Sequence, residues 1–195
     1  MRVLIACEFS GVVRDAFIVL GHDAVSCDLL PTEALGPHIH GDVREVLDEG
    51  WDLMIAFPPC THLAVSGARW FKEKIKEQQE AISFVEDIWR SPIKRISIEN
   101  PVSVLSTKSV LGKPTQIIHP WQFGYQQTKT TCLWLKNLPP IRPTRIMEPP
   151  HPKFWTAEER RKWNKVHREP PSPDRWKNRS RTQPGIAAAM AEQWG

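Results

Sequence analysis

Apolar residues follow two alternating patterns along the first two-thirds of the chain. Short apolar runs that end at a turn or at an acidic residue predict buried strands over 3–7, 24–27, 38–41, 53–57 and 95–98, with further strands over 116–118 and 131–135. Helical spacing of apolar residues predicts helices at two places, Val12 to Leu20 and Phe71 to Trp89. Alternating strands and helices are typical of an α/β protein built on a mostly parallel sheet.

The pattern changes after residue 138. Nine of the 18 prolines lie between Pro139 and Pro173, which excludes a regular sheet or long helix throughout this stretch. Thr156 and Glu159 have the spacing of a capping box and predict one short helix. The alanine-rich run from Ile186 to Trp194 predicts a helix at the end of the chain.

Composition is that of a globular protein without a membrane anchor. At 195 residues we expect one domain, or one domain with a small appendage. No apolar run approaches the ~20 residues that cross a bilayer, and the N-terminal apolar stretch lacks a signal-peptide cleavage pattern. The four cysteines are far apart in sequence, which fits a reducing cytoplasm and argues against disulfides and zinc knuckles.

Charge is unevenly distributed. The formal net charge is +4, yet residues 153–181 hold ten Lys or Arg against four Asp or Glu, so the rest of the chain sums to −2. This favours a polyanionic partner, and a solvated basic surface explains it equally well.

Chemistry-bearing residues follow five successive predicted strands, at the edge where α/β proteins bind ligands. They are Phe9-Ser10-Gly11, Asp28, Asp42, Pro58-Pro59-Cys60 and Glu99-Asn100-Pro101. One such strand end is weak evidence, but five successive ones predict a ligand-binding site at this edge of the sheet.

The first three strand ends fit an adenosine-containing ligand. Gly11 lets the backbone approach a ligand, Asp28 is placed to bind ribose hydroxyls, and Asp42 is placed to bind an adenine amino group. The turn lacks the G-x-G-x-x-G pattern of dinucleotide sites. Taken singly, each acid is better explained as a helix cap or a solvated loop residue than as a ligand contact.

The Pro58-Pro59-Cys60 step predicts a nucleophile. Two prolines stiffen the chain, so the Cys60 side chain has a fixed direction, and a nearby helix N-terminus is expected to make its thiol more acidic. A buried structural cysteine is the alternative, and we assign Cys7, Cys27 and Cys132 to the core in that way.

Glu99 leaves a buried strand, where partial withdrawal from water favours the form that can donate a proton. With Cys60 it gives a mechanism. The thiolate adds to carbon 6 of cytosine while Glu99 donates a proton to ring nitrogen 3. Carbon 5 then attacks an electrophilic methyl group, and a base removes the carbon 5 proton.

These motifs, followed by Gln127-Thr128-Lys129-Thr130-Thr131, resemble the motif series of the cytosine-5 DNA methyltransferases over residues 1–136, and residues 181–194 resemble that family's C-terminal helix. The resemblance implies a Rossmann-like, S-adenosylmethionine-dependent methyltransferase fold with a mostly parallel seven-stranded sheet and helices on both faces. It implies Cys60, Glu99 and Lys129 as catalytic residues. The donor site it implies consists of Phe9, Ser10, Gly11, Asp28, Asp42 and Pro58, and the substrate site of Pro59, Asn100, Gln127 and Thr131.

The sequence departs from the family pattern in two ways that matter. The family's Gln-x-Arg-x-Arg has Lys129 and Thr131 here, so two arginines are absent, and lysine does not replace the guanidinium fork. The large target-recognition region is missing. We therefore divide the chain into a catalytic core over 1–137, a Pro- and Trp-rich basic segment over 138–182, and a helix over 183–195 that packs back on the core.

The basic segment carries Trp155, Trp163 and Trp176, a mixture suited to stacking on bases and touching phosphates, or to covering a small satellite core. Its small size is compatible with a phage or mobile-element origin.

Methylation of cytosine in DNA is the leading hypothesis. The same chemistry on a free cytidine nucleotide or on single-stranded nucleic acid is the second, and a non-catalytic nucleic-acid-binding protein is the third. An amino-methyltransferase is the fourth hypothesis. Cys60 argues against it, because those enzymes generally have an aromatic residue at this position. No metal is expected, because His38, His40 and His62 lack a fourth ligand at a convincing spacing. The sequence does not define the oligomeric state.

Overall fold

The computed structural model describes the backbone of residues 1–195 and the side chains of all residues but Pro152 and His167. Its centre is one seven-stranded sheet with the order β3-β2-β1-β4-β5-β7-β6. The strands are β1 (Arg2–Ala6), β2 (Asp23–Asp28), β3 (His38–His40), β4 (Leu53–Ala56), β5 (Arg95–Asn100), β6 (Gln116–Ile118) and β7 (Thr131–Lys136). All neighbours from β3 to β5 pair in parallel, whereas β7 runs antiparallel to both β5 and β6. The predicted α/β fold with a mostly parallel seven-stranded sheet is confirmed.

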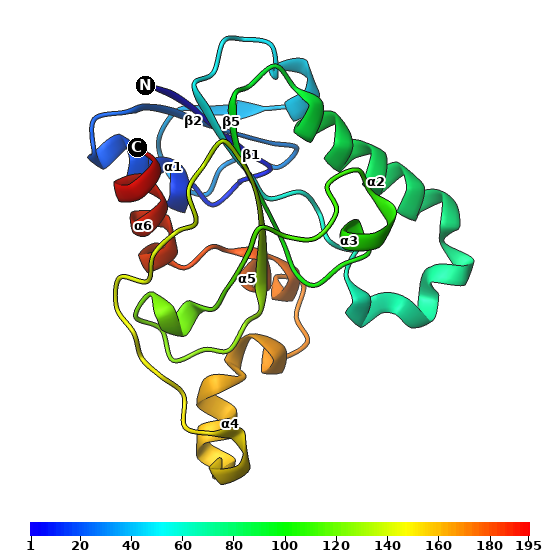
Figure 1. The fold of residues 1–195 in the computed structure, drawn as a ribbon, viewed down its shortest axis with the longest axis vertical. Coiled ribbons are helices and arrows are strands. Elements are labelled where there is room, and N and C mark those ends of the chain that lie inside the picture. Colours follow the sequence, from blue (N-terminus) through cyan, green and yellow to red (C-terminus); the bar gives the residue numbers. More distant parts are fainter.

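Side chains on successive strand residues face opposite sides of the sheet, and each side has its own core. Val3 and Ile5 of β1 belong to a cluster with helices α1 (Val12–Val19) and α6 (Pro184–Trp194). Leu4 and Ala6 belong to the other cluster, which includes α2 (Ile75–Arg90). Figure 1 shows α1 and α6 side by side, with α2 away from them across the sheet. Helices therefore cover both faces, as predicted.

The remaining elements are short. They are η1 (Val43–Glu45), η2 (Val65–Glu73), α3 (Leu105–Lys108), η3 (Pro120–Gln122), η4 (Pro152–Phe154), α4 (Ala157–Trp163), η5 (Lys165–Arg168) and α5 (Arg175–Ser180), where η denotes a 3-10 helix. No helix in the part of the chain described is both long and apolar enough to span a membrane.

Most predicted elements differ from the observed ones by one or two residues, and two differences have a clear backbone cause. The helix expected from Phe71 begins at Ile75, because Lys74 has φ −129° and ψ 41°, and Phe71 lies in the preceding 3-10 turn. The first strand ends at Ala6 rather than at Cys7, because Cys7 has a φ of 58° and turns the chain out of the sheet. Cys7 is half-buried rather than in the core, whereas Cys27 and Cys132 are buried as expected.

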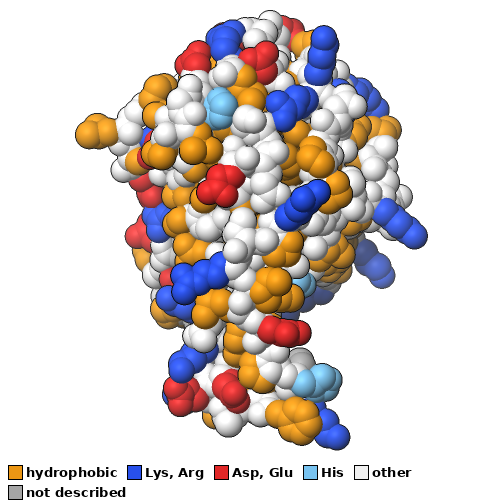
Figure 2. Space-filling model, turned by 60° about the vertical axis from the view of Figure 1, so that its left-hand side comes forward, with side chains coloured by type: hydrophobic (Ala, Val, Ile, Leu, Met, Phe, Trp, Pro, Cys, Tyr) orange, Lys and Arg blue, Asp and Glu red, His pale blue; other side chains and the backbone are white. Residues whose placement is uncertain are grey.

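Residues 138–182 contain the predicted short helix. Thr156 caps α4 by accepting from the Glu159 amide at 3.1 Å, and the Glu159 side chain accepts from the Thr156 amide. Trp163 is buried, and its carbonyl accepts from the Thr128 amide at 2.8 Å, which ties the segment to the core. α4 lies in a projection at one end of the molecule, where acidic, basic and apolar side chains are interspersed (Figures 1 and 2). The segment is therefore a small annex rather than a uniformly basic face.

Candidate active site

A cavity of about 570 Å³ opens at the carboxyl ends of β1, β4 and β5. Its walls come from stretches that are distant in sequence: 7–10, 57–61, 64–67, 99–102, 129–130, Val166, Trp176 and 179–182. Ligands of parallel α/β sheets bind at this edge, and the volume is within the ~300–1,000 Å³ of small-molecule sites.

Cys60 is exposed and lines this cavity. The chain before it is held by Asn100, whose Nδ2 donates to the Pro58 carbonyl at 3.0 Å. The chain after it is held by its own turn, because the Leu63 and Ala64 amides donate to the Cys60 carbonyl at 3.0 and 2.9 Å. The thiol is thus presented to the cavity from a fixed backbone.

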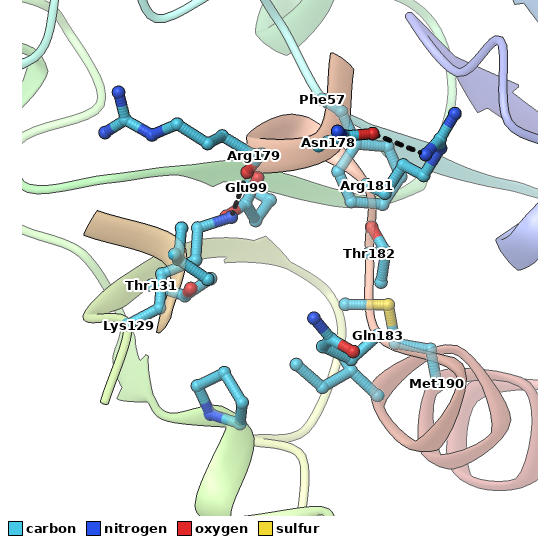
Figure 3. A pocket seen from close by; sticks show the side chains of 13 residues that line it. Phe57, Glu99, Lys129, Thr131, Asn178, Arg179, Arg181, Thr182, Gln183 and Met190 are labelled. Atoms are coloured by element: carbon cyan, nitrogen blue, oxygen red, sulfur yellow. Dashed lines mark hydrogen bonds and ion pairs between the residues drawn. The ribbon is translucent and has the colours of Figure 1, made fainter. Parts of the chain in front are cut away.

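Glu99 and Lys129 form an ion pair in the same cavity. Their Oε1 and Nζ atoms are 4.0 Å apart, and both side chains are largely buried. Lys129 Nζ also donates to the carbonyl of Arg179 at 3.4 Å, so the end of α5 lies directly over the pair (Figure 3). The structure brings together Cys60, Glu99 and Lys129, the three residues assigned to catalysis.

The electrostatic surroundings of Cys60 differ from expectation. Its pKa is raised, first by desolvation within the surrounding protein and second by the negative charge of Glu99, while Lys129 and Arg179 act in the opposite direction. The expected acidification by a helix N-terminus is wrong, because the element that follows is a 3-10 turn that begins only at Val65. In the free protein the thiol form is therefore favoured.

Phe9 and Ser10 line the cavity next to β1, and Pro58 and Pro59 line it next to β4. The N-terminus of α1 is already occupied by Glu8, a buried carboxylate that accepts from the Val13 and Arg14 amides at 2.8 and 3.2 Å. Burial raises the pKa of Glu8, and these hydrogen bonds oppose the shift.

Gly11 lies just behind this wall and does not line the cavity. Its φ is 74°, and a Cβ at this position would lie 2.5 Å from Nη2 of Arg14. Arg14 is fully buried and donates to the Leu35 carbonyl at 3.0 Å, which fixes the loop after β2. The glycine therefore makes room for a protein side chain, and its role toward a donor stays a prediction.

Asp28 and Asp42 lie at the same edge of the sheet, but neither lines the cavity. Asp28 accepts from the Leu30 amide at 2.9 Å, and burial raises its pKa. Asp42 caps η1 and bonds to the Arg44 guanidinium at 2.5 Å, a contact that lowers the pKa of Asp42. Their part in donor binding stays a prediction.

The remaining substrate residues predicted from the sequence occupy different places. Asn100 lines the cavity. Thr131 is buried and lines an adjoining recess of about 20 Å³ that shares Glu99 and Lys129 with the cavity. Gln127 lines neither space, and its Oε1 accepts from Gln183 Nε2 at 3.2 Å.

Sequence reasoning missed the wall that α5 contributes. Trp176 lies 6.0 Å from Phe9 between ring centroids, at an angle of 54°. Arg181 pairs with Glu33 at 2.6 Å, and the Glu33 amide donates to the Phe9 carbonyl at 2.9 Å. The basic and tryptophan-rich composition pointed to this segment, but no local pattern indicated which residues reach the cavity.

Two of the three histidines considered for metal binding have structural partners. His38 hydrogen-bonds Ser26 Oγ at 2.9 Å and the Leu30 carbonyl at 3.0 Å, and His40 hydrogen-bonds the Leu29 carbonyl at 2.9 Å. Among the residues whose side chains are described, no three His, Cys, Asp or Glu groups cluster as metal ligands would.

No protein-family model and no curated protein matches this sequence. Solved structures do match its fold. The Entamoeba histolytica methyltransferase EhMeth superimposes with a TM-score of 0.50 at 15% identity, over 76% of this chain and 57% of that one. The S. pombe Dnmt2 methyltransferase gives 0.45 at 16% identity, over 82% and 52%. The chain therefore spans a little over half of each protein. Its seven-stranded mixed sheet is that of the Rossmann-like methyltransferase fold.

Proposed function

We propose that this protein transfers a methyl group from S-adenosylmethionine to carbon 5 of cytosine in DNA, with Cys60 as the nucleophile. One observation carries the proposal: an exposed thiol on a fixed backbone shares a cavity with a carboxyl–ammonium pair. The structural similarity to the Entamoeba histolytica methyltransferase EhMeth supports methyl transfer as the reaction type.

The residues present fit the donor. Phe9 and Trp176 line the cavity with aromatic rings, and an aromatic ring attracts a positively charged group such as a sulfonium. Asn100 is 1% exposed, and its Nδ2 donates to the Pro58 carbonyl. Its Oδ1 has no hydrogen-bond partner among the described atoms. A hydrogen-bond donor on a bound ligand would satisfy this acceptor. S-adenosylmethionine would supply an electrophilic methyl group there.

The protein's own residues then act on the base. The Cys60 thiolate forms a bond to carbon 6, and Glu99 passes a proton to ring nitrogen 3, which makes carbon 5 nucleophilic. Lys129, whose Nζ is 4.0 Å from the Glu99 carboxyl, holds that group in place. After methylation, a base removes the carbon 5 proton, the bond between the Cys60 sulfur and carbon 6 breaks, and Glu99 takes back the proton from ring nitrogen 3, which restores the aromatic ring.

The test is covalent trapping on DNA that carries 5-fluorocytosine, whose fluorine does not leave as a proton would. With donor present, we expect an adduct that survives denaturation, and none with Cys60→Ser. Cys132→Ser is the matched control, because that thiol is buried in β7 outside the cavity. An adduct that persists in Cys60→Ser, or its absence with every DNA tried, would refute the proposal.

The same chemistry on a free cytidine nucleotide is the second candidate, favoured by the short 138–182 segment. Salt separates the two, since a polymer site releases about 0.7–0.9 counterions per phosphate contacted and a nucleotide site releases few. Turnover on the nucleotide with little salt dependence would select this candidate.

A further inference from the structure

Five charged side chains line the cavity, and four of them are neutralised within the protein. Glu8 binds the amides at the start of α1. Glu99 and Lys129 pair with each other, and Arg181 pairs with Glu33 outside the cavity. The fifth is Arg179, whose guanidinium has no hydrogen-bond or ion-pair partner among the side chains described. One positive charge is thus left for a ligand.

Arg179 lies on the side of the cavity where the base would bind. It lines both the cavity and the adjoining recess, which also contains Glu99, Lys129 and Thr131. Phe9 and Ser10, on the donor side, do not line that recess. Figure 3 shows the Arg179 side chain extended away from Arg181, on the same side of the view as Lys129.

The backbone at Arg179 is fixed, so its side chain projects from a defined point. Lys129 Nζ holds the Arg179 carbonyl at 3.4 Å. On the preceding turn Trp176 packs on Phe9, and two residues later Arg181 pairs with Glu33. Such anchoring reduces the entropy lost when a flexible side chain binds a ligand.

We propose that Arg179 is a substrate-binding residue that holds a phosphate next to the cytosine attacked by Cys60. The inference rests on the proposed function and adds to it a specific anion contact. A guanidinium forms two parallel hydrogen bonds to a phosphate, a geometry that an ammonium lacks. The 138–182 segment thereby supplies the arginine that the stretch from Gln127 to Thr131 does not have.

The test measures equilibrium binding without donor, so it does not depend on methyl transfer. A short labelled single-stranded oligodeoxynucleotide with one cytosine is compared with the same strand carrying neutral methylphosphonates at both linkages beside that cytosine. We expect the neutral linkages to weaken wild-type binding about tenfold, as loss of a charge-assisted hydrogen bond would. Arg179→Ala should bind the ordinary strand about tenfold more weakly and then lose less than about twofold to the neutral linkages.

Arg161→Ala is the matched control. It removes the same charge from the same segment but does not line the cavity, so it should keep full sensitivity to the neutral linkages. Arg179→Lys, which keeps the charge, should retain part of that sensitivity. If the losses from Arg179→Ala and from the neutral linkages multiply, or if Arg179→Ala binds like Arg161→Ala, the phosphate contact is refuted.

Competition separates the two sources of phosphate. Deoxycytidine monophosphate should displace the strand better than deoxycytidine from wild type, and equally well from Arg179→Ala, if a single nucleotide supplies the contact. If Arg179→Ala weakens binding of the strand but not of the mononucleotide, the phosphate is that of a polymer. If the effects of Arg179→Ala and of the neutral linkages are not additive but no fluorocytosine adduct forms, the proposed chemistry is rejected and the phosphate contact is kept. If an adduct forms but the two effects are additive, only the phosphate contact is rejected.

Discussion

Gly11→Ala is expected to destabilise the protein through Arg14, independently of any ligand. The substitution has two costs. The left-handed φ of 74° costs about 1–2 kcal/mol for a residue with a Cβ, and alanine returns about 0.4–1 kcal/mol by restricting the unfolded chain, which leaves about 1 kcal/mol. The new Cβ would also lie 2.5 Å from Arg14 Nη2 and 3.0 Å from the Ala34 Cβ. Overpacking of this kind costs about 1–3 kcal/mol, so we expect about 2–4 kcal/mol in total.

Gly21→Ala isolates the backbone cost. Gly21 has a φ of 81°, and no heavy atom lies within 4 Å of the Cβ position, so only the first cost of about 1 kcal/mol applies. Urea unfolding followed by tryptophan fluorescence gives both free energies of unfolding. If the two variants agree within about 0.5 kcal/mol, the crowding by Arg14 is refuted. If Gly11→Ala instead loses donor affinity at normal stability, Gly11 serves a ligand rather than Arg14.

Four further predictions concern the site. Because the pKa of Cys60 is raised from 9.0, alkylation of Cys60 by iodoacetamide should accelerate about tenfold per pH unit from pH 7 and still be rising at pH 9; a plateau at or below pH 9 would contradict the shift. Glu99→Gln removes the negative charge that is the second cause of the raised Cys60 pKa, so alkylation of Cys60 should become faster at neutral pH while adduct formation with fluorocytosine falls. Parallel changes in the two rates would argue against Glu99 as the proton donor. Asn100→Ala leaves the Pro58 carbonyl without its donor, which should lower the free energy of unfolding by about 1–3 kcal/mol and slow adduct formation. A double-mutant cycle on Glu33 and Arg181 should give a coupling of only about 0.2–1 kcal/mol that shrinks with added salt, because the two side chains are 35% and 39% exposed.

The sequence was sufficient to predict which strand ends meet at the site. Each strand reads as an apolar run, and the right-handed crossovers of parallel strands bring their carboxyl ends to one edge. That rule placed Phe9, Cys60 and Glu99 in one cavity although up to 90 residues separate them, as the lining shows.

Apolar spacing does not show which side chains contact one another across the fold. In the structure Arg14 lies beside Gly11 and Arg44 bonds to Asp42, and the role of both residues toward a donor stays a prediction. The end of α5 that carries Arg179 is held partly by Arg181, which pairs with Glu33, 148 positions away. Tertiary contacts over that range leave no periodic trace in the sequence.

The raised pKa of Cys60 is compatible with a nucleophilic role if the Cys60 thiol and the Glu99 carboxyl never carry negative charge at the same time. The charge of Glu99 raises the pKa of the thiol, so protonation of Glu99 removes one cause of the shift while Lys129 and Arg179 still favour the thiolate. When the sulfur bonds to carbon 6 it loses its charge, and Glu99 returns to the anion by giving its proton to ring nitrogen 3. On elimination the order reverses, because the departing thiolate forms as Glu99 takes the proton back. Burial first and the charge of Glu99 second keep the resting thiol protonated between turnovers, and the contribution of Glu99 is absent while that group carries its proton in the bound reaction.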